Sequence, residues 1–173
     1  MIELVFTRRY SMAHRLISGL SHKCATPHGH NEFVTVSLAA IDEVSLDHST
    51  NMITDFASAK GAWHEWIDDH IDHGFQLSDK DPLLEWAREH GQDWRIIVTP
   101  GDPTTEMLCA LFKAKCNAFL EANCPPLRCT TIRLEETPTN TVVFTGDPYE
   151  HLPKTDSKEN WGERPDMSTH DME

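Results

Sequence analysis

The stretch KCATPHGHNEFVTVSLAAI, residues 23–41, predicts the first part of the fold and contains a candidate metal site. Over residues 31–41, apolar and polar side chains alternate and β-branched residues recur, a pattern that favours a half-buried β-strand. His28 and His30 lie just before this strand and share the parity of Val34. Because alternate side chains of a strand point to one face, we expect both imidazoles on the buried face.

A third metal ligand is expected from His14, in the sequence SMAHRL, if the strand that it ends pairs with residues 31–41 in a hairpin. Three neutral nitrogen ligands with an open fourth position are the arrangement of a catalytic zinc site. If Cys24 filled the fourth position, the site would be closed and structural. A His-x-His pair also occurs by chance in a chain with 11 histidines, so these residues leave three interpretations open.

The rest of the chain predicts an α+β fold. The expected elements are strands over 2–14, 31–41, 128–137 and 141–146 and helices over 56–71 and about 103–122. Asp55 is the expected N-cap of the first helix, and Asp102, followed by Pro103 at the first helical position, that of the second. The segment between the helices is irregular and charged, with a possible short helix at PLLEWAREH and a possible strand at 95–99. This order predicts a four-stranded antiparallel sheet with two helices on one face.

Composition limits the classes of protein and partner. A chain of 173 residues is long enough for one domain with its own core, which we place at residues 1–146. Residues 147–173 are acidic, contain several prolines and have few aliphatic residues, so we expect an extended or disordered tail. The net charge of −13 argues against binding to nucleic acid or to an anionic membrane. No apolar run is long enough to span a bilayer, and the N-terminus does not resemble a signal peptide. The five cysteines form no CxxC pair, and we expect a cytoplasmic protein with reduced thiols.

Six short motifs resemble those of the 6-pyruvoyl-tetrahydropterin synthase / 6-carboxytetrahydropterin synthase family, over roughly residues 4–146. They are YSMAHRL (10–16), CATPHGH (24–30), MITDF (52–56), IDH (71–73), PTTE (103–106) and EET (135–137). Each motif is short, but all six occur in the family's order. The resemblance implies the tunnelling fold, in which the subunits of a trimer or hexamer join their sheets into a barrel with the sites at their interfaces.

The resemblance also implies a role for each residue that matches a motif. The implied residues are the zinc ligands His14, His28 and His30, the catalytic residues Cys24, Asp72 and His73, and the substrate-binding residues Thr105, Glu106 and Glu136. Two of these residues have another interpretation, because the helix dipole favours both positions without any function. His73 would be a histidine near a helix C-terminus, and Glu106 a glutamate in a first helical turn. Glu136 shares the parity of Leu134, so it is expected to point inward and to need a partner.

The implied substrate is 7,8-dihydroneopterin triphosphate. Three residues separate Cys24 from the His-Gly-His, a spacing that resembles the carboxytetrahydropterin enzymes of queuosine biosynthesis, whose reaction releases triphosphate and acetaldehyde. The alternative is the pyruvoyl enzyme of the biopterin pathway, and a less favoured one is a zinc-stabilised module without catalytic activity. The cations expected to hold the triphosphate are not distinguished by sequence, and the candidates are Arg8, Arg9, Arg15 and Lys23.

Overall fold

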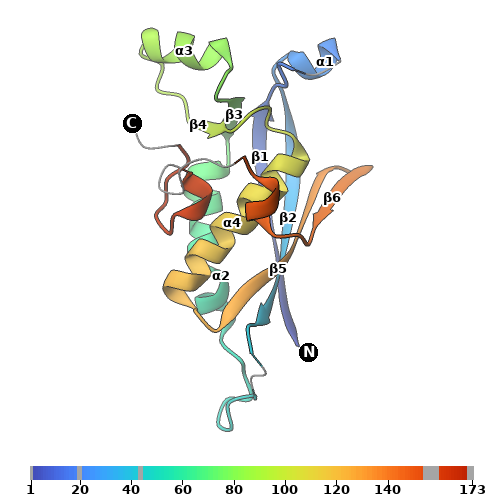
Figure 1. Cartoon of the computed structure of the whole chain (residues 1–173), viewed down its shortest axis with the longest axis vertical. Helices are drawn as coiled ribbons and strands as arrows, with labels where there is room; N and C mark the ends of the chain where they lie inside the picture. The colour runs from blue at the N-terminus through green and yellow to red at the C-terminus, as the bar shows by residue number, and fades with distance from the viewer. Residues whose placement is uncertain (1, 19–20, 43–44, 154–159, 171–173) are drawn as a thin grey trace.

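A computed structural model describes residues 2–18, 21–42, 45–153 and 160–170 (Figure 1). The strands are β1 (Glu3–His14), β2 (His28–Ala40), β3 (Gly74–Ser78), β4 (Ile96–Thr99), β5 (Leu127–Thr137) and β6 (Asn140–Phe144). The helices are α1 (His22–Ala25), α2 (Phe56–Trp66), α3 (Pro82–Glu89), α4 (Thr105–Asn123) and α5 (Pro148–His151), with a π-helical turn at Ile67–Ile71 and a 3-10 turn at Trp161–Glu163. The four predicted strands and two predicted long helices are therefore confirmed.

The sheet is mixed and six-stranded, in the order β4-β3-β1-β2-β5-β6. Strands β1, β2, β5 and β6 pair antiparallel, as predicted, but β3 and β4 extend the sheet with parallel pairing beside β1. The prediction of a four-stranded, purely antiparallel sheet was therefore wrong. Four of the five residues of β3 are buried, so this strand lacks the alternation that reveals a half-buried strand.

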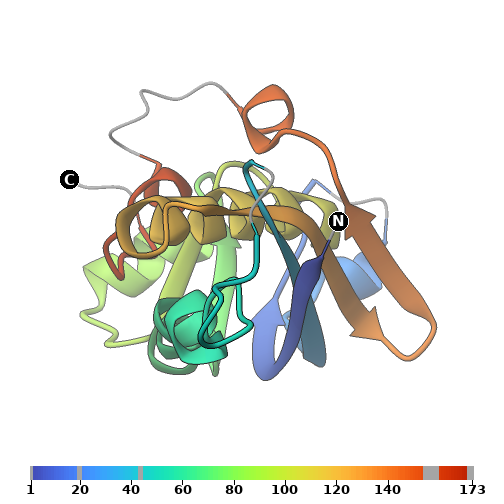
Figure 2. The same ribbon diagram turned by 90° about the horizontal axis from the view of Figure 1, so that it is seen from below.

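Helices α2 and α4 pack on one face of the sheet, and Figure 2 shows α4 lying across the strands. Their contact is aromatic: Trp63 and Trp66 pack against Phe112 with ring centroids 5.7 and 5.6 Å apart. Valines and leucines of β2 and β5 complete this core from the sheet side. Burial of one face of each element, rather than helix propensity alone, accounts for the stability of these helices.

The two long helices begin differently from one another. Asp55 caps α2 by accepting a hydrogen bond from Ser58 N, as predicted. Helix α4 is capped by Thr104, which accepts from Met107 N, so the prediction of Asp102 as cap was wrong. The Asp102 carboxylate instead accepts hydrogen bonds from the N–H groups of Ile17 and Ser18, and it therefore ties the loop after β1 to the start of α4.

The described part of the segment after β6 packs on the domain. Trp161 is 1% exposed and donates from Nε1 to the carbonyl of Val98 in the edge strand β4. The N–H of Val98 donates to the carbonyl of Thr169, so this segment covers the outer edge of β4. The buried ammonium of Lys115 on α4 donates to four carbonyls of the same segment. The expectation of an extended or disordered tail was therefore wrong for residues 160–170, while residues 154–159 lie outside the described part.

Two features place the candidate site. Strand β1 ends and β2 begins at the same end of the sheet, where α1 and α3 also lie (Figure 1). The ion pair of Arg15 with Asp81, the N-cap of α3, joins the chain after β1 to this helix. Among the described residues, no helix is both long enough and apolar enough to cross a membrane.

Candidate functional site

The three histidines of the predicted metal site come together at the β1–β2 end of the sheet. In the antiparallel register His14 lies opposite His28, and Met12 lies opposite His30. One ring nitrogen of each histidine lies within 4.8 Å of the others. Gly29 makes this close pairing possible, because a Cβ atom there would lie 2.6 Å from the carbonyl oxygen of Met12. The glycine thus makes room for the backbone of the neighbouring strand.

Backbone carbonyls orient the two opposed rings. His14 Nδ1 lies 3.0 Å from the carbonyl oxygen of Pro103, and His28 Nδ1 lies 2.8 Å from that of Thr26. A carbonyl only accepts, so each Nδ1 carries the proton and each Nε2 is left with a lone pair. Burial lowers the pKa of His14 below its usual value, against the opposing effect of the Pro103 carbonyl, so this ring is neutral near pH 7.

The Nε2 atoms meet as metal ligands do. His14 Nε2 and His28 Nε2 are 3.1 Å apart, a separation that fits two nitrogen ligands of one metal ion. His30 Nε2 is buried and has no hydrogen-bond partner among the described residues. Three imidazoles, two of them with Nδ1 bonded to a backbone carbonyl, match the donor set and outer shell of a zinc site. The residues therefore fit a divalent metal, and zinc in particular.

Cys24 lies near these ligands in the chain but outside their group. It is half-buried on α1, and its carbonyl accepts a hydrogen bond from Leu16 N, two residues after His14. Within the described residues, the cluster that could hold a metal contains the three histidines and not Cys24. A closed site with Cys24 as fourth ligand is therefore not formed within the described part of this chain.

Asp72 and His73 form a hydrogen-bonded pair beside β1. The π-helical turn ends at Asp72, whose Oδ1 accepts from Ser11 N, while His73 N donates to the Ser11 carbonyl. His73 Nδ1 lies 2.9 Å from Asp72 Oδ2. Burial alone would raise the pKa of Asp72, but the hydrogen bonds from Ser11 and His73 outweigh it and lower the pKa. His73 has a φ of 59°, rare for a non-glycine residue, and strain of this kind occurs at functional sites.

The predicted substrate-binding residues lie at the start of α4 and near the end of β5. Thr105 is buried and donates from Oγ1 to Glu136 Oε1 at 2.9 Å. Glu136 lies close enough to His14 to oppose the lowering of the His14 pKa by burial, so this carboxylate lies near the candidate metal ligands of the same chain. Glu106 is exposed in the first turn of α4, a position that the helix dipole alone also favours. The substrate-binding roles of these residues remain predictions.

Three buried polar residues of this region were missed by the sequence analysis. Glu32 follows His30 on the same strand face, is 0% exposed, and accepts a hydrogen bond from the hydroxyl of Tyr10. Burial raises the pKa of Glu32 to about 7. Gln76 of β3 lies beside His14 in the parallel register, and neither polar atom of its amide has a partner among the described residues. The parity of Glu32 with the histidines was an available signal, whereas β3 itself had not been predicted.

The candidate phosphate-binding cations differ in their partners. Arg8 pairs with Asp68, and Arg15 pairs with the buried carboxylate of Asp81. Arg9 donates to the neutral side chain of Asn31, which leaves its positive charge without an acidic partner in the described part of the chain. The remaining candidate, Lys23, is exposed on α1 next to Cys24. Arg9 and Lys23 are therefore the candidates whose charges are least compensated.

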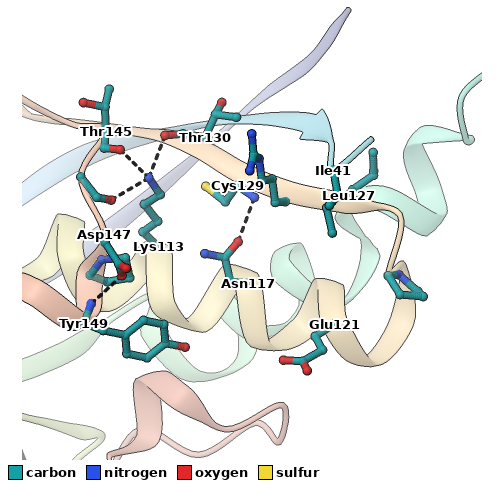
Figure 3. Close-up of a pocket in the computed structure, with 14 residues that line it drawn as sticks. Ile41, Lys113, Asn117, Glu121, Leu127, Cys129, Thr130, Thr145, Asp147 and Tyr149 are labelled. Atoms are coloured by element: carbon teal, nitrogen blue, oxygen red, sulfur yellow. Dashed lines mark hydrogen bonds between the residues drawn. The ribbon is translucent and has the colours of Figure 1, made fainter. Parts of the chain in front are cut away.

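A cavity of about 700 Å³ lies elsewhere, between α4 and the segments on either side of the β5–β6 hairpin (Figure 3). Lys113 reaches into its wall, but its ammonium donates to the carbonyls of Thr130, Thr145 and Gly146. None of the predicted site residues lines this cavity. Since the three donors of Lys113 are used within the protein, the cavity is not the candidate active site.

Comparison with known proteins agrees with the geometry. The family model described as 6-pyruvoyl tetrahydropterin synthase matches residues 3–147. A probable 6-carboxy-5,6,7,8-tetrahydropterin synthase of Halobacterium salinarum is 30% identical over 136 residues, which cover 78% of this chain and 80% of that protein. A 6-carboxy-5,6,7,8-tetrahydropterin synthase of Rickettsia felis is 29% identical over 109 residues, which cover 62% of this chain and 75% of that protein.

Solved structures show the same fold at lower identity. An uncharacterised protein of Wolinella succinogenes aligns with a TM-score of 0.69 and 17% identity, over 84% of this chain and 98% of that one. The 6-pyruvoyl tetrahydropterin synthase of Caenorhabditis elegans aligns with a TM-score of 0.58 and 22% identity, over 84% and 96% of the two chains. Together with the sequence matches, these likenesses establish that the chain belongs to the 6-pyruvoyl tetrahydropterin synthase family.

Proposed function

We propose that this protein is a zinc-dependent 6-carboxy-5,6,7,8-tetrahydropterin synthase, which converts 7,8-dihydroneopterin triphosphate with loss of triphosphate and acetaldehyde. The observation that carries the proposal is the convergence of one ring nitrogen from each of His14, His28 and His30, with Cys24 outside the ligand group. Three nitrogen ligands leave a coordination position for the substrate, as catalysis requires. The spacing of Cys24 from the His-Gly-His and the curated relatives named as 6-carboxy enzymes favour this branch of the family.

The proposed roles follow from the chemistry of the side chains. Zinc held by the three histidines would supply a Lewis acid for the side-chain oxygens of the substrate. Cys24, as a thiolate, would remove a proton from the substrate side chain. His73, oriented by Asp72, would act as the partner acid and base. Glu136 would accept hydrogen bonds from the pterin ring, with Thr105 holding its carboxylate in place.

We further propose that the active form is a trimer or hexamer whose sheets join at their edges. Strand β1 pairs with β3 only from Met12 to His14, so residues 3–11 have no strand partner on that side within the described part of the chain. Strand β6 is the opposite edge of the sheet. Open edges of this kind are unfavourable in a monomer. The side chain of His73 is 79% exposed at the β1 edge, where an adjoining subunit would cover it.

Incubation of the zinc-loaded protein with 7,8-dihydroneopterin triphosphate, with the products resolved by mass spectrometry, tests the proposal. Acetaldehyde and 6-carboxytetrahydropterin are the expected products, and Cys24→Ala is expected to form neither. A 6-pyruvoyl product would retain the family chemistry and assign the protein to the alternative branch. Zinc binding without turnover, with Cys24 protected from alkylation by the metal, would support the non-catalytic module instead.

A further inference from the structure

The metal-binding face of the sheet continues inward as a row of polar side chains. Tyr10 on β1 lies opposite Glu32 on β2. Phe33 lies opposite Glu135 on β5 as the last pair of this register, and Glu32 and Glu136 are the next residues of the two strands beyond that pair, with Glu136 at an irregularity between Glu135 and Thr137. Two carboxyl groups therefore lie side by side, next to the three histidines.

These two carboxyl groups form an unusual pair. Like charges on neighbouring strands repel, and the repulsion is stronger where water is excluded. The donors found on the pair are the hydroxyl of Tyr10, which bonds Glu32 Oε2, and that of Thr105, which bonds Glu136 Oε1. Neither hydroxyl carries a positive charge. Glu32 Oε1 is buried and has no partner among the described residues, so it is an acceptor whose hydrogen bond the described part of the chain does not supply.

The position of the pair relative to the metal ligands indicates what it binds. Glu32 lies two residues from His30 on the same strand face, a step of roughly 7 Å along the strand. That step allows one end of a flat two-ring heterocycle to meet the carboxyl groups while a substituent at its other end reaches the histidines. The edge of such a ring that best satisfies two adjacent carboxyl groups carries several N–H donors in one plane.

We propose that Glu32 is a second ring-binding residue, which together with Glu136 accepts hydrogen bonds from the N–H and amino edge of a 2-amino-4-oxo heterocycle. The proposal rests on the proposed pterin-binding function and adds a specificity residue to it. The amino group has two hydrogens, so Glu32 and Glu136 can each accept from the same edge. A ring with a carbonyl in place of the amino group would bring an oxygen acceptor toward two carboxyl groups, and the site would reject it.

The test is a binding titration of the zinc-loaded protein with neopterin, followed by its intrinsic fluorescence, and with the 2,4-dioxo analogue of neopterin. Glu32→Gln preserves the size of the side chain and is expected to weaken neopterin binding roughly ten- to hundredfold. The preference for neopterin over the dioxo analogue should fall by a similar factor. Glu135→Gln is the matched control, because Glu135 faces the other side of the strand, and it is expected to change the affinity less than about twofold.

Two further measurements separate ring binding from a structural role. Zinc affinity, measured by competition with a chelator, should be the same in Glu32→Gln and in the unmodified protein, since the three histidines are intact. Tyr10→Phe removes the hydroxyl partner but leaves the Glu32 acceptors, so it should retain neopterin affinity within about threefold. Glu32→Met removes both acceptors and is measured in parallel, with an expected loss at least as large as that of Glu32→Gln.

The outcomes distinguish this inference from the proposed function. If the unmodified protein binds neopterin and Glu32→Gln binds it equally well, Glu32 does not contact the ring and the inference fails alone. If Tyr10→Phe reproduces the loss, Glu32 acts through the core and the inference also fails. If the unmodified protein does not bind neopterin at all, the proposed pterin site is itself wrong.

Discussion

Replacing Lys115 with methionine should release the segment that covers β4. The Lys115 ammonium is 0% exposed and donates to the carbonyls of Trp161, Arg164, Asp166 and Ser168 at 2.6 to 3.2 Å. It also lies 5.1 to 6.0 Å from the centroids of three aromatic rings. Burial lowers its pKa to about 8, so the group still carries a charge at pH 7.

The loss can be bounded from these contacts. A hydrogen bond from a charged donor contributes about 1.5 to 3 kcal/mol, so the three hydrogens of the ammonium, shared among four carbonyls, would suggest about 4.5 kcal/mol or more. Detachment of the segment limits the loss, because its carbonyls would then bond to water. We therefore expect Lys115→Met to lower the free energy of unfolding by about 3 to 5 kcal/mol, which is a decrease in Tm of about 10 °C.

Scanning calorimetry measures the Tm, and hydrogen exchange with mass spectrometry measures the protection of residues 160–170. Lys60→Met is the control, because Lys60 lies on the surface of α2 with its ammonium 5.9 Å from the ring of Phe56, and its Tm should change by less than about 2 °C. A Lys115→Met variant with the original Tm and an equally protected segment would refute the reasoning.

Three further predictions concern the metal, the thiol and the loop around the site. Zinc at a hundred times its Kd should stabilise the protein by about 2.7 kcal/mol, or about 5 to 10 °C in Tm, and a chelator or His30→Ala should abolish the shift in a thermal melt. Cys24→Ala should lower turnover at least about a hundredfold while retaining that zinc-dependent shift, so a lost shift would make Cys24 a metal ligand. Burial alone would raise the pKa of Asp81, but hydrogen bonds from Arg15 and from Leu83 N outweigh this effect and lower the pKa below its usual value of 3.8. The ion pair therefore stabilises the fold fully above the unfolded-state pKa. Its contribution is lost as the pH falls through the lower pKa of the folded state. Asp81→Asn should therefore lower the Tm by about 5 °C at pH 7 and by progressively less below about pH 4; a difference that does not depend on pH would show that the charge is unimportant.

The elements with a strong period were predictable from sequence, and the others were not. Strands β1, β2 and β5 alternate because one face of each is buried, and α4 has an apolar face of more than four turns. Strand β3 is buried almost throughout and contains Gly74, where a Cβ would lie 2.8 Å from the carbonyl oxygen of Ile71. The conformation of such a strand is determined by the strands beside it, and a local sequence pattern carries no information about those neighbours.

The same distinction holds for the site. The parity of His28 and His30 and the hairpin position of His14 were sufficient to predict that the three rings meet. The sequence could not show that Thr26 and Pro103 supply the carbonyls that orient two of the rings, because Pro103 is distant along the chain. Lys115 was equally unpredictable, since a buried lysine is recognisable only once its carbonyl partners are in place.

The covering of β4 by a later segment has a consequence for synthesis on the ribosome. Val98 accepts from Trp161, which lies 63 residues further along the chain. At typical elongation rates this separation corresponds to roughly 3 to 13 s, during which β4 would present an open parallel edge to other nascent chains. A chaperone that binds exposed strands would therefore bind β4 during that interval. Conditions that slow elongation through residues 99–161 should increase aggregation without changing the stability of the finished protein.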